Sequence, residues 1–259
     1  MNISFSIITV TLNAFEDLNK TINSIQNQNY KKYTHIIKDG LSKDKTNQID
    51  FSKFRNIFFY EYPDKGIYDA MNQGLKLAKN EFIIFLNAGD IFFSNNTLKE
   101  LAENIMKNPN FNSYSGGTLQ IDAKKNLIIR AMGLGKIYNF LPLSQLPHPS
   151  LVIKKTILNK LNDPFDSNLK IAGDYKQQLI LRKKNLLKTL HFNQIISIMP
   201  IGGISNKNKL SILKGYKETI IFSFELYNFK IIYIVFIKLF LNIYSIFYTR
   251  KFKNLKIKY

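Results

Sequence analysis

The chain has 259 residues, of which 45% are hydrophobic, enough to bury one large core and too many for a disordered protein. It has no cysteine, which excludes disulfides, thiolate metal sites and thiol nucleophiles. The net charge of +19 suits a protein that binds nucleic acid or an anionic membrane surface, although the many Asn, Ile, Phe, Tyr and Lys residues also fit a plain compositional bias.

Strands and helices are predicted to alternate over the first 90 residues. The apolar, β-branched run at residues 4–10 predicts a buried strand, and no basic segment precedes it, so we expect no signal peptide. Apolar residues recur at helical spacing over 15–25 and again over 67–79. Further strands are predicted over 33–38, 57–62 and 81–86.

This alternation predicts a parallel, doubly wound sheet, in which ligands bind beyond the carboxyl ends of the strands. Asp39 and Asp90 lie in the turns that follow the second and fourth predicted strands, so we expect both carboxylates at the same rim. The pattern is weaker over 111–135. Beyond it, His148-Pro149-Ser150 precedes a strand, and a helix is predicted over 172–184. His35 and His191 lie within strand patterns, so we expect them to be structural.

The last part of the chain, 206–259, differs from the rest. It contains 11 Lys or Arg and 2 Asp or Glu, a net charge of +9, which a general bias does not explain. Residues 208–228 predict an amphipathic helix. In the following 18 residues, 231–248, only Lys238, Asn242 and Ser245 are neither apolar nor Tyr, and as a helix this run is about 27 Å long, close to the thickness of the hydrocarbon core of a bilayer. We therefore predict a membrane-associating tail, with packing on the protein's own core as the alternative.

Glycine-rich phosphate loops of the dinucleotide-binding and P-loop types are absent from the sequence. Strand-end Asp residues remain, which is the arrangement by which a divalent cation holds a diphosphate. Six segments in chain order, SIITVTLN (6–13), DGLSKDKT (39–46), DKGIYDAMNQG (64–74), FLNAGD (85–90), AGDY (172–175) and GGIS (202–205), together resemble the family 2 glycosyltransferases of the capsule, O-antigen and exopolysaccharide type, which have the GT-A fold. The resemblance covers about residues 4–205.

The resemblance implies a role for each matching residue. Asp39 would hydrogen-bond the nucleotide base, usually uracil, and Asp64 would help to hold the sugar nucleotide, with Gly66 allowing a close backbone approach. Asp90 would coordinate Mg²⁺ or Mn²⁺ on the diphosphate, and Asp174 would be the catalytic base of an inverting displacement. Further site residues are expected in the opening strand, in the FLNAGD turn and near the sugar and acceptor, namely Thr9, Thr11, Asn13, Asn87, His148 and Tyr175. The segment GGIS would close over the site.

One motif departs from the family pattern. Where a D-x-D-D stretch is usual, this chain has Asn87-Ala88-Gly89-Asp90, so that the metal would depend on Asp90, water and the diphosphate. Structural roles are the alternatives elsewhere: a turn former for Asp39, a helix N-cap for Asp64, a first-turn carboxylate for Asp174 and a turn residue for His148. Asp69 is expected to be structural.

The sequence therefore predicts a GT-A-type α/β domain over 1–205, with a mostly parallel, doubly wound sheet, and a basic, apolar helical tail over 206–259. The predicted function is inverting transfer of a sugar from a nucleotide-diphosphate donor, expected to be a UDP-sugar, to a lipid-linked glycan in surface polysaccharide synthesis, at the cytoplasmic face of the inner membrane. Two alternatives remain, a membrane-associated α/β assembly protein with impaired catalysis and a nucleotidyltransferase. We expect no nucleic-acid partner, because the Lys excess adjoins an apolar run and is not interleaved with aromatic residues on a basic face.

Overall fold

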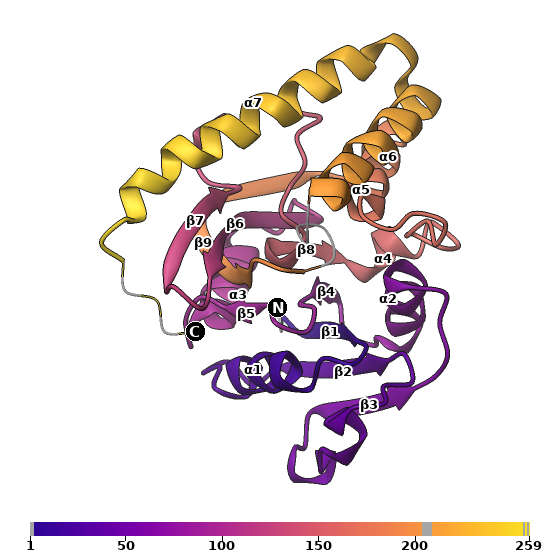
Figure 1. Cartoon of the computed structure of the whole chain (residues 1–259), viewed down its shortest axis with the longest axis vertical. Coiled ribbons are helices and arrows are strands. Elements are labelled where there is room, and N and C mark those ends of the chain that lie inside the picture. Colours follow the sequence, from indigo (N-terminus) through magenta and orange to yellow (C-terminus); the bar gives the residue numbers. More distant parts are fainter. Residues whose placement is uncertain (1–2, 204–208, 256, 258) are drawn as a thin grey trace.

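The computed structural model describes residues 3–203, 209–255, 257 and 259. One nine-stranded sheet, in the order β3-β2-β1-β4-β8-β6-β9-β5 with β7 paired to β6, forms the centre of the molecule (Figure 1). The strands are β1 (Phe5–Thr11), β2 (Tyr33–Asp39), β3 (Ile57–Glu61), β4 (Phe82–Phe85), β5 (Ile91–Phe92), β6 (Ser113–Asp122), β7 (Leu127–Met132), β8 (Leu151–Lys154) and β9 (Thr189–Pro200). The helices are α1 (Phe15–Gln26), α2 (Ile67–Leu77), α3 (Thr97–Lys107), α4 (Lys155–Leu158), α5 (Gly173–Lys183), α6 (Lys209–Tyr227) and α7 (Ile231–Thr249).

The predicted parallel half of the sheet is confirmed. Strands β3, β2, β1 and β4 pair in parallel, and the two predicted helices connect β1 to β2 and β3 to β4, whereas two short 3-10 turns connect β2 to β3. Strand β1 is buried along its whole length because helices cover both faces, which explains its uninterrupted apolar run. Phe5 and Ile7 face one core with α3, while Ile8 and Val10 face the other core with α2.

The other half of the sheet is mixed. Strand β8 lies antiparallel between β4 and β6, whereas β6 and β9 pair in parallel. Gly116 and Gly117 of β6 allow close packing, because a Cβ atom at these positions would lie 2.6 Å from an Ile196 side-chain carbon and 2.3 Å from one of Leu134. This half completes the core beneath the carboxyl end of β4.

The tail packs against the sheet domain. Helix α6 lies beside α5, and α7 runs along one side of the molecule and contacts β7 (Figure 1). Ile237 and Leu241 of α7 belong to the same core cluster as Tyr68 and Phe85, so one face of the apolar run is packed on the protein's own core. The predicted boundary after Ser205 lies outside the described residues, and the independence of the two parts stays a prediction.

His35 and His191 both lie in strands, β2 and β9, as expected. The Thr9 hydroxyl donates to the Leu86 carbonyl at 2.7 Å and therefore accepts from His35 Nε2 at 2.8 Å. His35 is wholly buried in this network, and burial lowers its pKa from 6.5 to about 3. The imidazole is therefore neutral in the folded protein.

This buried histidine leads to a prediction about acid stability. The unfolded chain takes up a proton near pH 6.5 whereas the folded chain resists it down to about pH 3, so stability is lost as the pH falls between these values. Between pH 7 and pH 4 the wild type should lose about 3 kcal/mol more unfolding free energy than His35→Gln. Urea unfolding at each pH measures this difference. Equal losses in the two proteins would contradict it, and between pH 7.5 and pH 8.5 the two should change alike.

Candidate active site

The ends of β1, β2 and β4 are joined by backbone hydrogen bonds. The amide of Gly40, after β2, donates to the Thr11 carbonyl at 3.0 Å, and the amide of Ala88, after β4, donates to the Val10 carbonyl at 3.4 Å. The turns that carry Asp39 and Asp90 therefore flank the end of β1, at the sheet edge that the parallel topology predicted. The Thr11 hydroxyl is buried at this point without a hydrogen-bond partner among the described residues.

Asp39 is fully buried, and its carboxylate shapes the turn after β2. It accepts from the Ser42 amide at 2.7 Å and from the Ser42 hydroxyl at 2.5 Å. Asn13, just beyond β1, contacts the same turn through two hydrogen bonds of 2.7 Å. Its backbone amide donates to Ser42 Oγ, and its side-chain oxygen accepts from the backbone amide of Lys43. These contacts fit the turn-forming alternative and also hold Asp39 rigidly at the edge of the sheet.

Asp64 lies against the same turn through a buried lysine. The side chain of Lys38 is inaccessible to solvent, and its ammonium group donates to Asp64 Oδ2 at 3.0 Å and to the carbonyls of Asp39 and Tyr62, each at 2.7 Å. A Cβ on Gly40 would lie 2.7 Å from Asp64 Oδ2, so only glycine allows this approach. Asp64 Oδ1 also accepts from the Gly66 amide at 3.0 Å.

The start of α2 shows why glycine occupies position 66. Gly66 has a φ of 129°, a conformation that side-chain-bearing residues avoid, and it directly precedes the first residue of the helix. Asp69 accepts from the Lys65 amide at 2.8 Å and from Gln73, which confirms the structural role expected for it. Asp64 and Asp69 together fix the entry to α2.

Helix α1 holds the FLNAGD turn in place through the side chain of Thr21. Thr21 accepts a hydrogen bond from the Gly89 amide and donates to the Asp90 carbonyl, both at 2.9 Å. Asp90 is almost completely buried, and this burial raises the pKa of its carboxyl to about 8, with a further contribution from the negative charge of Asp17. Among the described residues, no basic side chain pairs with the Asp90 carboxyl, and the buried Asn87 Oδ1 has no hydrogen-bond donor.

The C-terminal residue lies beside this turn. The Tyr259 hydroxyl donates to the Gly89 carbonyl at 2.8 Å, and the ammonium group of Lys20 lies 4.7 Å from the centre of the Tyr259 ring. Burial raises the pKa of the Tyr259 phenol well above its usual value, as do the charges of Asp17 and Asp90. The predicted closing segment 202–205 is described only at Gly202 and Gly203, which form an exposed turn; Ile204 and Ser205 lie outside the described residues.

Asp174 lies in the first turn of α5, where the helix dipole favours a negative charge. Gln145 Nε2 lies 3.4 Å from Asp174 Oδ2. The segment just before α5 is fixed by Glu218 of α6, whose carboxylate accepts from three consecutive backbone amides at 2.9–3.0 Å, those of Lys170, Ile171 and Ala172. Glu218 thus positions the helix that carries Asp174.

His148 packs against the end of β4, close enough to Asp174 for the Asp174 charge to affect its pKa. Its ring stacks on Phe85, the last residue of β4, with centroids 5.1 Å apart, and meets Phe165 edge-on. Burial lowers the pKa of His148, and the charge of Asp174 acts in the opposite direction. Both ring nitrogens are buried without a hydrogen-bond partner among the described residues.

Two predicted site residues have their polar groups engaged inside the protein. The Thr9 hydroxyl bonds Leu86 and His35 within the sheet. The Tyr175 hydroxyl donates to the Leu143 carbonyl at 2.6 Å, and its ring packs edge-on against Phe222. Both side chains are fully buried, so they support the candidate site from the protein interior.

Three charged residues near these groups had not been predicted to belong to the site. Two of them are Lys38, which bonds Asp64, and Glu218, which bonds the backbone before α5. The third is Lys238 of α7, whose ammonium group donates to Thr219 Oγ1 at 2.7 Å and lies 5.4 Å from the centre of the Tyr175 ring. Burial lowers the pKa of Lys238 to about 8, while the charges of Asp174 and Glu218 act to raise it. Lys38 carried a sequence signal, since a lysine inside a strand buried on both faces needs a partner.

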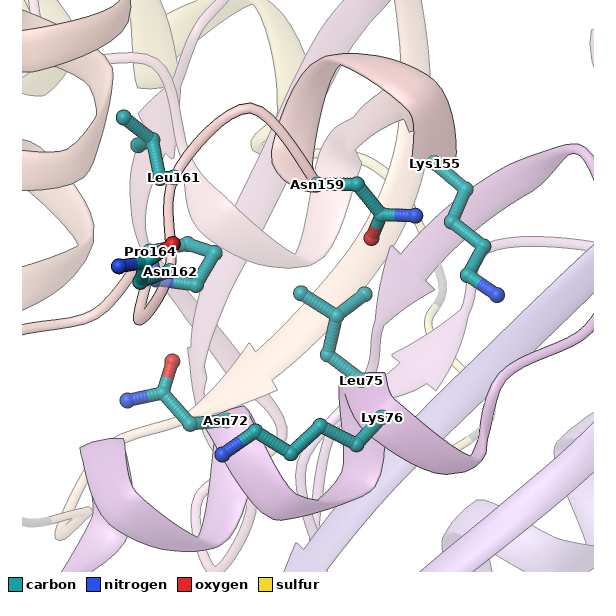
Figure 2. A pocket seen from close by; sticks show the side chains of 8 residues that line it. All are labelled: Asn72, Leu75, Lys76, Lys155, Asn159, Leu161, Asn162 and Pro164. Carbon is teal, nitrogen blue, oxygen red and sulfur yellow. The ribbon is translucent and has the colours of Figure 1, made fainter.

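The surface hollow shown in Figure 2 lies away from these turns. Its volume is about 200 Å³, and Lys76, Lys155 and Asn159 are among the residues that line it. Ligand pockets usually measure roughly 300–1,000 Å³. None of the predicted site residues lines this hollow, so we do not regard it as the site for a nucleotide sugar.

Fold and site define a class of protein: an α/β protein with carboxylates at or just beyond the ends of β2, β3 and β4, beside the end of β1, where a nucleoside diphosphate can bind. The sequence model of glycosyl transferase family 2 matches residues 6–154. The chain belongs to this family and is a glycosyltransferase. The resemblance identified from the six motifs is thereby confirmed.

A relative and two solved structures extend the comparison. The chain is 27% identical over 215 residues, 81% of this chain and 82% of the relative, to the UDP-Glc:α-D-GlcNAc-diphosphoundecaprenol β-1,3-glucosyltransferase WfgD of Escherichia coli. The crystal structure of S. aureus TarS 1–349 with UDP-GlcNAc superposes with a TM-score of 0.65, 19% identity and coverage of 86% of this chain and 66% of that one. The mannosyltransferase PcManGT of Pyrobaculum calidifontis, in complex with GDP-Man and Mn²⁺, gives a TM-score of 0.62, 14% identity and coverage of 83% and 64%. At these identities the two structures confirm the fold alone.

Proposed function

We propose that this glycosyltransferase transfers a sugar, with inversion, from a UDP-sugar to a lipid-linked glycan during the synthesis of a surface polysaccharide. The observation that carries the proposal is the joining of the turns with Asp39 and Asp90 to the end of β1, with Asp64 held against the first turn by Lys38. WfgD, which is named for a UDP-sugar donor and a diphosphoundecaprenol acceptor, and TarS, which binds UDP-GlcNAc, support the donor and acceptor classes.

In this proposal the acceptor hydroxyl attacks the anomeric carbon as the bond from that carbon to the UDP oxygen breaks. Asp174 takes the hydroxyl proton, a contribution typically worth about 10²–10⁴-fold in rate. His148, whose two ring nitrogens have no hydrogen-bond partner among the described residues, bonds sugar or acceptor hydroxyls near Asp174. At the other end of the site, Asp39 and the Thr11 hydroxyl contact the nucleoside, and Asp64 holds the sugar nucleotide.

The residues of the FLNAGD turn fit a divalent cation. Within the part of the chain that the structure describes, the buried Asp90 carboxyl, whose pKa burial raises to about 8, has no basic partner, and the amide oxygen of Asn87 has no hydrogen-bond donor. No group of three or more acidic, His or Cys side chains gathers among the described residues, so the protein offers these two oxygens and the diphosphate would complete the shell. Bound there, Mg²⁺ or Mn²⁺ would neutralise the charge that develops on the departing UDP.

The proposed location is the cytoplasmic face of the inner membrane. A lipid-linked acceptor is confined to the membrane, and nucleotide sugars are cytoplasmic metabolites, so the two substrates meet at that surface. Residues 209–252 form a helical stretch that is apolar and long enough to cross a membrane by length and composition. The basic residues after α7 suit anionic headgroups, each worth about 1 kcal/mol near the surface.

A screen of nucleotide sugars tests the proposed donor class. UDP and at least one UDP-sugar, with Mn²⁺, should raise the melting temperature of the protein, because a ligand that binds only the folded state stabilises it by about 2.7 kcal/mol at 100 times its Kd. GDP and CDP compounds serve as matched controls. Stabilisation by none of the uridine compounds would contradict the proposal.

The variant Asp90→Ala separates the metal from the nucleotide in the same screen. It should lose the part of the UDP stabilisation that requires Mn²⁺ while keeping the part measured with a chelator. An exposed carboxylate elsewhere, changed as Asp163→Ala, is the control and should behave as the wild type. If the wild type binds UDP equally well with and without the cation, the metal role of Asp90 is wrong.

A further inference from the structure

Helix α7 has its polar side chains toward the protein. Lys238 bonds Thr219, and Asn242 accepts from the Arg130 guanidinium at 2.7 Å while donating to the Tyr216 hydroxyl at 2.6 Å. At the end of the helix the Thr249 hydroxyl accepts from the Ala131 amide at 2.9 Å. Lys238 and Asn242 of the polar stripe thus bond other parts of the protein, and Ser245 is buried with its hydroxyl bonded to the Asn242 carbonyl, so the stripe faces the folded domain.

The opposite face of α7 is apolar and open to solvent. Phe236 is 64% exposed and Ile232 is 75% exposed. The large apolar side chains exposed along this face, at spacings of three and four residues, are Ile232, Phe236, Leu239, Phe240, Ile243, Ile246 and Phe247. The face runs the length of a 19-residue helix, about 28 Å, and α6 exposes further large apolar side chains such as Leu213 and Phe224. So long an apolar face requires a cover.

The packing of α7 is incompatible with crossing a bilayer. The folded domain lies along the inner side of the helix, because Ile234 packs with Tyr175 and Phe222 while Ile237 and Leu241 pack with the core beside Phe85. Crossing would strip these contacts away and bring the Lys238 charge into hydrocarbon, at a cost of about 2.5–3.5 kcal/mol for the charge alone. A helix that keeps its polar side on the protein can lie only along the membrane surface.

The charge around this face identifies the cover. Exposed basic residues lie on α6 and in the segments directly before and after α7, and they are Lys209, Lys214, Lys217, Lys230, Arg250, Lys251 and Lys253. Glu225 is the one exposed acidic residue within the described span 209–255. Two copies of such a surface would repel each other, whereas anionic lipid headgroups attract it.

We propose that the outer face of α7 lies in the plane of an anionic bilayer, with its apolar side chains among the acyl chains and its polar stripe on the protein. The chain is thus a surface-bound protein and not one that spans the membrane. Interfacial helices bury their apolar face about 5–10 Å deep. This inference deepens the membrane part of the proposed function, but its test involves no sugar transfer, so the two can fail separately.

The absence of tryptophan from the sequence makes the test direct. Ile232→Trp, Leu239→Trp and Ile246→Trp each place one fluorophore on the same face, seven residues apart. Quenching by lipids brominated at different depths, in phosphatidylglycerol-containing vesicles, should give the same shallow depth for all three. Phe58→Trp, on β3 and 48% exposed, is the matched control and should not be quenched.

Other outcomes overturn the proposal. A spanning helix would place position 239 about 10 Å deeper than positions 232 and 246. No quenching at the three positions means that lipid does not cover the face, and a doubled mass in solution would then identify a second copy as the cover. In the charge test, Lys251→Glu with Lys253→Glu should weaken binding to anionic vesicles about tenfold or more. Unchanged vesicle binding by this double variant, with its fold confirmed by circular dichroism, would refute the electrostatic part.

Discussion

Asp174→Asn is expected to lower the rate of sugar transfer by about 100-fold or more, because an amide cannot accept the proton of the acceptor hydroxyl. The substitution preserves the shape of the side chain, and the Glu218 contacts that position α5 do not involve it. UDP should therefore stabilise the variant as much as the wild type. The measurement is transfer of label from UDP-sugars to a membrane lipid extract, alongside UDP-dependent melting.

The control for this prediction is Asp163→Asn, an exposed Asp paired with Lys76, which should retain the wild-type rate. Retention of more than a tenth of the rate by Asp174→Asn would show that another group takes the proton. Equal loss of transfer and of UDP binding would instead indicate a structural role for Asp174, the alternative that its place in the first helical turn allows.

Lys38→Met is expected to produce the largest loss of stability, about 3–5 kcal/mol, which is typical when one partner of a buried ion pair is removed. Three acceptors lose their donor together: the carboxylate of Asp64 and the carbonyls of Asp39 and Tyr62. Urea unfolding at pH 7 measures the effect.

A second substitution separates charge from packing. In Lys38→Met with Asp64→Asn the uncompensated carboxylate is gone, so part of the lost stability should return. The half-exposed pair of Lys154 and Glu81 provides the matched control, and Lys154→Met should cost about 1 kcal/mol or less. A Lys38→Met protein within about 1 kcal/mol of the wild type would refute the importance assigned to this pair.

The parallel half of the fold was predictable because its signals are local. Each strand from β1 to β4 is a short apolar run, and helices of regular periodicity follow β1 and β3. The order of the C-terminal half was not predictable, because β6 pairs with β8 and β9, which are distant from it in sequence, and its two glycines interrupt the strand pattern.

The candidate site was predictable to the same extent. Asp39 and Asp90 were expected at one rim from topology alone, and backbone bonds to β1 confirm that their turns meet there. Glu218 and Lys238 were missed because they approach Asp174 from the tail, and sequence periodicity does not define how a tail folds back. Periodicity identified the polar stripe of α7, but only the packing shows that the stripe faces inward.

The three bonds from Glu218 to the backbone before α5 have a geometric consequence. Asp174 is attached through them to the same helical hairpin that contains α7, by packed contacts and not by a flexible tether. With α7 on the bilayer, Asp174 is held at one fixed height above the lipid headgroups. An acceptor hydroxyl would then react only when its saccharide extends that distance from the membrane. The length of the glycan would therefore contribute to acceptor selectivity together with the identity of its sugars.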